Sequence, residues 1–362
     1  MTDEALEKKV RSGGVRPGSD PGMRAHDSTP GDTKTEVSTG DLPDLETVQG
    51  VVALAHRTYL DVRDGQVADY IPALAEASPD LFGIAIVGVR GRAGGIGEST
   101  HPFTIQSVVK PFLFALVCEA LGHRVVRERL GVNATGLPFD SVMAVEIAAD
   151  GLTNPLVNSG AIAATSLAPG ETAEQKWEFL VDGLSRFAGR DLEVDQVVLD
   201  SERATNGRNE AMARLMAGHG RLYFDPDEAT DVYTRLCSLR VTATDLATMG
   251  ATLADGGVNP VTLRRVVSPD TCRRTLAVML TAGLYELSGD WLYEIGLPAK
   301  SGVSGGIVTV APGKGGLATF SPPLDAAGNS VRGQLATKLL SEALGLDLLV
   351  SRPFEEPDSA RG

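Results

Sequence analysis

The chain has 362 residues, of which 43% are hydrophobic, and its net charge is −14. This length and apolar content allow one large domain, or two closely joined ones, with a sizeable core. The acidic balance disfavours binding to nucleic acid or anionic membranes, and three separated cysteines and five histidines without CxxC or HExxH spacing predict no disulfide framework and no metal site.

The two ends of the chain are polar. Residues 1–43 are rich in Gly, Pro, Ser, Thr and charged side chains. Such a segment cannot bury enough surface to offset its ordering entropy, so we expect a disordered tail there and a flexible tail over residues 351–362. The start lacks the apolar core of a signal peptide, and no stretch reaches the roughly 18 apolar residues of a membrane span, so the sequence predicts a cytoplasmic protein.

Between the tails, the hydrophobic pattern predicts strands near both ends and helices in the middle. Residues 45–61 have helical spacing, and residues 81–99 read as a strand, a Gly-rich turn and a second short strand. Further helices are predicted over residues 107–121, 141–150, 171–189, 208–218, 226–236, 242–255 and 269–283.

The last predicted elements are a hairpin and a helix. Residues 306–311 and 316–321 are strand-like and flank a Pro-Gly turn, and residues 330–345 have helical spacing. This order favours an α+β fold in which one antiparallel sheet is assembled from both chain ends and flanked by helices. A helical subdomain would be inserted over about residues 122–280.

Ser107 and Lys110 form the only Ser-x-x-Lys of the chain, at a predicted helix start. Positions i and i+3 share a helix face, so the amine can approach the hydroxyl. A lysine can take the proton of a serine nucleophile if burial lowers its pKa, and the apolar residues around Lys110 would provide that burial. Free N–H groups at a helix start favour a developing oxyanion, and Pro111 is tolerated in the first turn.

A lone Ser-x-x-Lys also arises by chance, but a second motif accompanies it. Lys300-Ser301-Gly302 is the only Lys-[Ser/Thr]-Gly, and its glycine would let a substrate approach the backbone. The two motifs together are typical of serine penicillin-recognising enzymes. Residues 302–306 also spell GxSxG, but that motif needs a following helix and a later histidine, and no histidine follows His219.

Longer blocks around these motifs resemble the serine-dependent glutaminases of bacteria and mitochondria. The blocks are residues 68–75, 103–110, 154–162, 201–209 and 297–307. The resemblance runs from about residue 46 to residue 348. It implies a β-lactamase-like α+β fold, a catalytic domain over residues 44–350, hydrolysis of L-glutamine to L-glutamate and ammonia without a cofactor, and assembly as a homodimer or homotetramer.

The resemblance also implies roles for single residues. Ser107 would be the nucleophile and Lys110 its general base, with the backbone N–H groups of Ser107 and Val303 as the oxyanion hole. Tyr285 would assist proton transfer, and Tyr70 would hold the substrate over the serine. Substrate-binding residues would be Asn158, Glu202, Asn209, Tyr233, Tyr285 and Val303, supported by Lys300, Ser301 and Gly302. A carboxylate suits an α-ammonium, and amides and hydroxyls suit a carboxylate.

Two positions depart from the pattern of the glutaminases: Pro111 replaces a plain apolar residue, and Ser304 a Gly or Ala. Two alternatives remain. A serine β-lactamase or penicillin-binding-type enzyme shares both motifs, but it would need export and a Ser-Asp-Asn triplet, which the chain lacks. A catalytically inactive relative that binds an amino acid is disfavoured by the intact Ser107, Lys110 and Tyr285.

Overall fold

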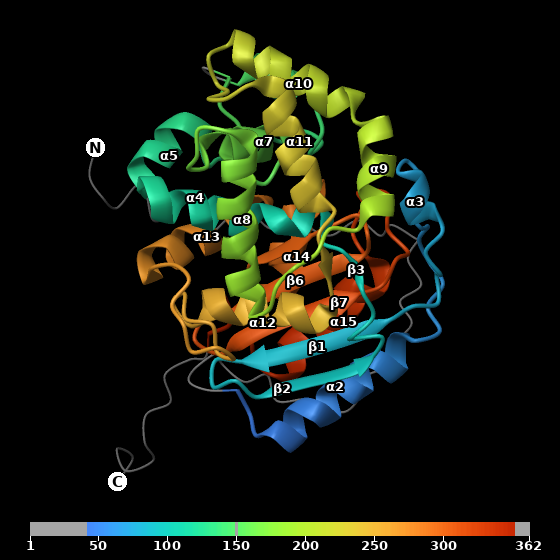
Figure 1. Ribbon diagram of the computed structural model, residues 1–362. Helices are drawn as coiled ribbons and strands as arrows, with labels where there is room; N and C mark the ends of the chain where they lie inside the picture. The colour runs from blue at the N-terminus through green and yellow to red at the C-terminus, as the bar shows by residue number, and fades with distance from the viewer. Residues whose placement is uncertain (1–41, 149–150, 352–362) are drawn as a thin grey trace, which may run out of the picture. The chain divides into compact units, whose positions relative to one another are not determined.

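Both ends of the folded region contribute strands to one sheet. The structure is a computed structural model that describes residues 42–148 and 151–351 (Figure 1). Of the two predicted tails, only residues 42, 43 and 351 belong to these ranges. The rest of the tails lies outside the described residues, so both tails stay predictions.

The main sheet has five strands in the order β2-β1-β7-β6-β5, and each neighbouring pair is antiparallel. A separate pair, β3 and β4, forms a short two-stranded ladder. The strand bounds are β1 Gly83–Gly88, β2 Ala93–Gly97, β3 Phe103–Thr104, β4 Arg240–Val241, β5 Ala299–Ser301, β6 Gly306–Ala311 and β7 Gly315–Phe320. Since β1 and β2 precede the central helices and β5 to β7 follow them, the predicted α+β sheet built from both chain ends is confirmed.

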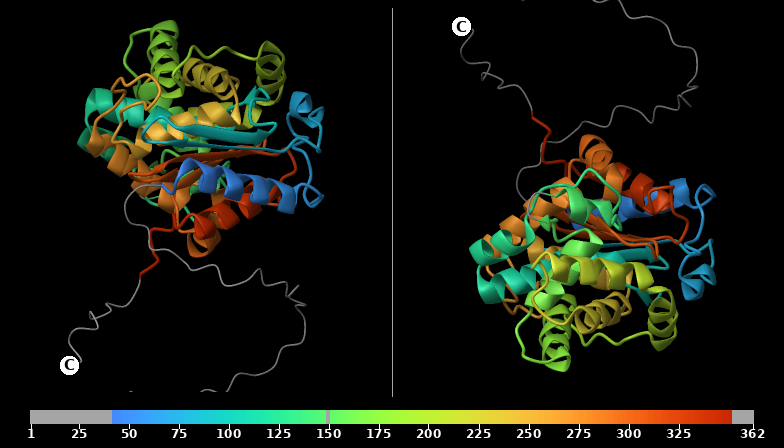
Figure 2. Two further views of the ribbon diagram at one scale, coloured as in Figure 1. Left: turned by 90° about the horizontal axis from the view of Figure 1, so that it is seen from below. Right: turned by 90° about the horizontal axis from the view of Figure 1, so that it is seen from above.

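Alternation along the strands places apolar side chains on both faces of this sheet. Ile84 and Ile86 of β1 join the core under α2 and α15, whereas Ala85 and Val87 join the larger core on the opposite face. Figure 2 shows the sheet edge-on between these two groups of helices. A strand buried on both faces has a continuous run of apolar residues, and such a run in β1 predicted the strand from the sequence.

Helices make up most of the remaining described chain. Their bounds are α2 Leu45–Tyr59, α3 Pro72–Ala75, α4 Val109–Leu121, α5 His123–Leu130, α6 Met143–Ile147, α7 Asn158–Leu167, α8 Ala173–Ala188, α9 Gln196–Thr205, α10 Gly207–Gly218, α11 Pro226–Cys237, α12 Ala243–Ala254, α13 Pro269–Ala282, α14 Ser288–Ile295 and α15 Val331–Ala343. The helices α3, α5, α7, α9 and α14 were not among the predicted elements. None of the helices in the described ranges combines the length and apolarity needed to cross a membrane.

Helix α4 lies at the centre of the helical region, and its first ten residues are all buried. It contacts α7, α8 and α13 (Figure 1). Helix α12 belongs to the range predicted as an inserted helical subdomain, yet it packs on β1, β6 and β7 of the sheet. The boundary of that subdomain at about residues 122–280 therefore stays a prediction.

Close contact between α12 and the sheet depends on Gly316. A Cβ at this position would lie 2.1 Å from the Ala247 carbonyl oxygen and 2.3 Å from the Ala251 nitrogen. We expect Gly316→Ala to lower the free energy of unfolding by about 3 kcal/mol or more, because backbone atoms must move apart. The matched control is Gly50→Ala on the exposed face of α2, where nothing lies within 4 Å of the added carbon.

Chemical denaturation followed by circular dichroism measures both changes. Gly50→Ala should leave stability unchanged or raise it by about 0.5–1 kcal/mol, through helix propensity alone. Equal stabilities of the two variants would contradict the close packing of α12 on β7.

Candidate active site

Ser107 lies in a tight 3-10 turn, η1 (Gln106–Val108), directly before α4. The sequence predicted that the α-helix begins at Ser107, but the first regular helical residue is Val109. The preceding Gln106 has a φ of 49°, in the left-handed region that side-chain-bearing residues rarely adopt. Such strain persists only where the surrounding structure holds it, and it concentrates at functional sites.

The turn that carries Gly302 packs directly against the Ser107 turn. A Cβ at Gly302 would lie 3.0 Å from a Val108 methyl and 3.1 Å from the Ile105 carbonyl oxygen. The Ser304 hydroxyl donates to the Thr104 carbonyl oxygen at 2.7 Å, so this departure from the glutaminase pattern ties the Gly302 turn to β3, the strand just before the Ser107 turn. Val303 lies between Gly302 and Ser304 in the chain, and its N–H has no backbone acceptor among the described residues.

Lys110 is fully buried, and its Nζ donates a 2.7 Å hydrogen bond to Asn158 Oδ1. Burial lowers the pKa of Lys110 to about 8, and Cys237 and Asp140 oppose this shift. The Phe139 ring covers the amine, with 5.7 Å between Nζ and the ring centroid. The apolar burial that the sequence predicted for this lysine is therefore present, and it places the amine near the protonation state that a general base requires.

Tyr285 connects the Ser107 turn to β5. Its hydroxyl donates to the Ser301 carbonyl oxygen at 3.1 Å, and Ser107 lies close enough to favour the ionised form of the phenol. Tyr285 has a φ of 55°, so a second left-handed residue lies at this site. Burial raises the pKa of Tyr285, which keeps it a neutral donor.

Lys300 and Ser301 belong to the edge strand β5 and precede the hairpin of β6 and β7. Lys300 is fully buried and its Nζ lies 4.2 Å from the Tyr285 ring centroid. Burial, and then the Lys110 ammonium, lowers the pKa of Lys300 well below its ordinary value. The Ser301 hydroxyl is buried without a hydrogen-bond partner among the described residues.

A cavity of about 420 Å³ opens in front of Ser107. Seven of the residues predicted from the sequence line it: Tyr70, Ser107, Asn158, Glu202, Asn209, Tyr233 and Val303. Tyr70 is half exposed, whereas Tyr233 is buried. The other predicted residues, Lys110, Tyr285, Lys300, Ser301 and Gly302, do not line this cavity; of these, Lys110 is hydrogen-bonded to Asn158 of the lining, and Gly302 packs against the Ser107 turn.

Glu202 forms the acidic wall of the cavity. Its Oε1 accepts a 2.5 Å hydrogen bond from Gln106 Nε2. Burial raises the pKa of Glu202 to about 7, against hydrogen bonds from Gln106 and Ser238 that lower it. A buried carboxyl without a cationic partner favours binding of a ligand cation, which would restore its charge.

The structure adds residues to the cavity that the sequence analysis missed. Gln106, Phe139, Asp140, Thr205, Arg208 and Cys237 also line it. Burial raises the pKa of Cys237 to about 12, so this thiol stays protonated and is not a competing nucleophile. Gln106 directly precedes Ser107 in the block 103–110, and this adjacency could have identified it as a site residue.

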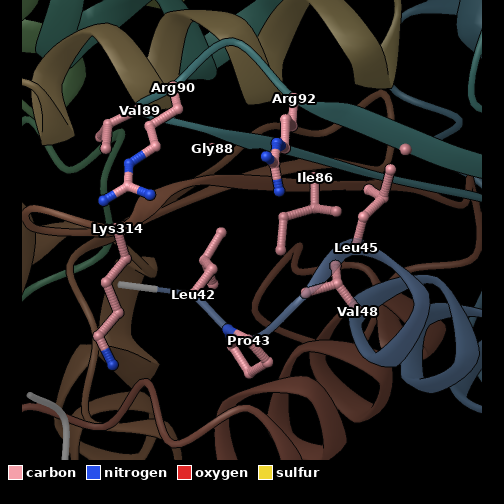
Figure 3. A pocket seen from close by; sticks show the side chains of 11 residues that line it. Leu42, Pro43, Leu45, Val48, Ile86, Gly88, Val89, Arg90, Arg92 and Lys314 are labelled. Carbon is pink, nitrogen blue, oxygen red and sulfur yellow. The ribbon is translucent and has the colours of Figure 1, made fainter. Parts of the chain in front are cut away.

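A second hollow lies beside α2 and β1 (Figure 3). It is smaller, about 70 Å³, and its lining includes Leu42, Ile86, Arg90, Arg92 and Lys314. None of the predicted site residues contributes to it. Of these two hollows, only the cavity at Ser107 is lined by residues that the sequence predicted for the site.

Comparison with known proteins identifies relatives over most of the chain. The family model described as Glutaminase matches residues 65–349. "Glutaminase 2" of Yersinia pestis is 58% identical over 320 residues, which are 88% of this chain and 94% of that protein. A glutaminase of Brucella canis is 49% identical over 293 residues, which are 81% of this chain and 92% of that protein.

Solved structures agree with the sequence relatives. A structure described as probable glutaminase ybaS has a TM-score of 0.84 and 44% identity, and it covers 85% of this chain and 100% of its own. The Bacillus subtilis glutaminase YbgJ, in a covalent complex formed by reaction with 6-diazo-5-oxo-L-norleucine, has a TM-score of 0.74 and 30% identity, with 84% and 99% covered. These similarities confirm the predicted β-lactamase-like α+β fold class.

Proposed function

The chain belongs to the glutaminase family, and from this premise we propose that it hydrolyses L-glutamine to L-glutamate and ammonia through an acyl-enzyme on Ser107. The observation that carries this proposal is a cavity lined by Ser107, Glu202 and Asn158, with the buried Lys110 amine hydrogen-bonded to Asn158 directly behind it. The YbgJ structure supports a covalent route, since that protein reacts with a diazoketone analogue.

The cavity suits the amino-acid end of glutamine. Glu202 would pair with the α-ammonium, which would hold the carboxyl ionised despite its burial. Asn158, Asn209 and Tyr233 offer amide and hydroxyl donors for the α-carboxylate. This end then directs the side-chain amide toward Ser107, and Tyr70 covers the bound substrate.

The first half-reaction forms the acyl-enzyme. Neutral Lys110 takes the Ser107 proton while Oγ bonds to the amide carbon, and the resulting oxyanion accepts hydrogen bonds from the N–H groups of Ser107 and Val303. Tyr285 passes its proton to the leaving nitrogen and regains one from the Lys110 ammonium, so the C–N bond breaks, ammonia departs, and both Tyr285 and Lys110 are neutral again. Burial and the nearby Lys110 lower the pKa of Lys300, whose Nζ lies beside the Tyr285 ring, so the site disfavours two full positive charges.

The second half-reaction returns the enzyme to its starting state. Lys110 takes a proton from water, whose oxygen attacks the acyl carbon, and the same two N–H groups hold the second oxyanion. The bond to Ser107 Oγ breaks, Oγ regains a proton from the Lys110 ammonium, and L-glutamate leaves.

Substrate choice tests the proposal. Purified protein should release ammonia from L-glutamine, should act far less on the shorter L-asparagine, and should leave a chromogenic cephalosporin intact. Ammonia is followed by a coupled glutamate dehydrogenase assay, and cephalosporin opening by absorbance. Cephalosporin turnover without ammonia release would move the chain to the penicillin-recognising alternative, and no reaction with any of the three would support an inactive binding relative.

Other expectations from the resemblance also remain proposals. We propose a homodimer or homotetramer, a cytoplasmic location, and a catalytic domain over residues 44–350. Light scattering of the full chain tests the first of these.

A further inference from the structure

A row of side-chain amides leads from the active-site lysine to a residue outside the cavity. Lys110 Nζ donates to Asn158 Oδ1 at 2.7 Å, and Asn158 Nδ2 donates to Asn209 Oδ1 at 3.0 Å. Asn209 Nδ2 donates in turn to Asn206 Oδ1 at 2.8 Å. Asn158 and Asn209 line the cavity, whereas Asn206 does not.

The row continues from Asn206 to the backbone of α11. Asn206 Nδ2 donates to Thr234 Oγ1 at 2.8 Å, and that hydroxyl donates to the Thr230 carbonyl oxygen at 2.8 Å. Thr234 is buried, so this end of the row is held by the protein interior. A carbonyl oxygen can only accept, and a lysine ammonium can only donate, so both ends fix the same donor-to-acceptor direction.

This direction decides what the two cavity asparagines offer to a ligand. Each amide nitrogen has two N–H bonds and uses one of them within the row, so a second N–H remains for a substrate carboxylate. With the amides reversed, carbonyl oxygens would face the carboxylate, and an N–H group would face the Lys110 ammonium. Both contacts would be repulsive.

Asn206 also occupies a structural junction. It is the last capping residue of α9, which carries Glu202, and the first capping residue of α10, which carries Asn209. Its side chain therefore links the orientation of Asn209 to the packing of α11 against these two helices.

We propose that Asn206 is a positioning residue of the active site: it fixes the amide direction of Asn209 and Asn158 and thereby holds the substrate carboxylate and Lys110. This inference rests on the proposed glutaminase activity. Asn206 touches neither the substrate nor the reacting atoms and acts only through the two cavity asparagines.

Two substitutions separate this role from a merely structural one. Asn206→Ala removes the acceptor for Asn209, so kcat/KM for L-glutamine should fall roughly 10-fold, mainly through KM. Asn206→Asp keeps that acceptor in the same volume, so KM should stay near its wild-type value. Thermal unfolding of both variants shows that they fold.

The pH profile supplies the second readout. Asp140 on the α5–α6 loop, Cys237 on α11 and Lys300 on β5 are the titratable groups around Lys110. Loosening Asn158 in Asn206→Ala weakens an acceptor of the charged amine, so the acidic limb of kcat/KM should move to lower pH. The added carboxylate in Asn206→Asp should move it to higher pH, each by on the order of half a unit.

A control and a double variant complete the test. Asn133→Asp makes the same chemical change at an exposed loop residue outside the cavity, and it should leave the kinetic constants unchanged. In an Asn209→Ala background, Asn206→Ala should cause no further rise in KM, because the row is already broken.

Three results would overturn the inference. The first is a wild-type KM together with a wild-type acidic limb of the kcat/KM profile in Asn206→Ala. The others are equal shifts of that limb in Asn206→Ala and Asn206→Asp, or fully additive effects on KM in the double variant. If wild-type protein itself releases no ammonia from L-glutamine, the proposed function fails first. That result is distinct from an active wild type whose Asn206 variants match it.

Discussion

Replacing Ser107 by alanine should lower the rate of ammonia release from L-glutamine by roughly 10⁴-fold or more. Removal of Oγ removes the atom that forms the acyl bond, and no other nucleophile in the cavity replaces it, since burial keeps the Cys237 thiol protonated. Mass spectrometry of intact protein with a diazoketone analogue should show an adduct on the wild type and none on the variant.

Binding should survive this change. The groups that would hold the amino-acid head, Glu202, Asn158 and Asn209, do not depend on the Ser107 hydroxyl, so calorimetry should give a similar Kd for L-glutamate. Ser341→Ala is the control, because Ser341 is equally buried and donates to the Ile295 carbonyl oxygen behind the sheet. It should lose about 1 kcal/mol of stability and keep its activity. Unchanged ammonia release by Ser107→Ala would refute the acyl-enzyme.

The elements that the sequence predicted well share a strong local signal. The hairpin β6–β7 has apolar runs on either side of a Pro-Gly turn, and α4 is apolar on every face. Helix α7 was not predicted because most of its residues are small, so it lacks the regularly spaced large apolar side chains that reveal a helix. Helix α9 was missed because only Val198 and Leu199 of its residues are buried, which leaves little apolar periodicity to detect.

In the active site, too, features set by local sequence could be predicted, whereas contacts between distant segments could not. The expectation that Ser107 and Lys110 act together comes from their local spacing, and the depressed pKa of Lys110 follows from its burial. The contact of Gln106 with Glu202 spans 96 positions of sequence, and that of Lys110 with Asn158 spans 48. No periodicity encodes such contacts. They join η1 to α9 and α4 to α7, so only the packed structure reveals that Asn158 contacts the base as well as the cavity.

Replacing Lys110 by methionine should lower kcat about 10²–10⁴-fold, because it removes the general base from both half-reactions. Stability should be retained or should rise. The folded state disfavours the Lys110 proton, so at pH 7 the buried ammonium costs free energy that methionine does not. This cost shrinks as pH rises from about 8 toward the ordinary lysine pKa near 10.5, so any gain from methionine should shrink over the same range.

The pH profile of the wild-type kcat/KM also tests Lys110 as the general base. A general base acts when it is neutral, and the neutral fraction of Lys110 grows as pH rises through about 8. The kcat/KM for L-glutamine should therefore climb about tenfold per pH unit below that value and then level off. Glu202, with its pKa near 7, should add a rise in KM as pH falls below 7, because its protonated form no longer attracts the α-ammonium.

Lys176→Met distinguishes a catalytic lysine from a merely buried one. Lys176 is also buried, and its Nζ donates to the carbonyl oxygens of Ala168 at 2.6 Å and Ser166 at 3.1 Å, away from the cavity. Its loss leaves two carbonyls without a donor, so stability should fall by about 1–3 kcal/mol while kcat stays near wild type. Lys110→Met should show the opposite combination, with activity lost and stability kept. If both variants lost stability and activity together, Lys110 would be a packing residue, and a different group would have to take the Ser107 proton.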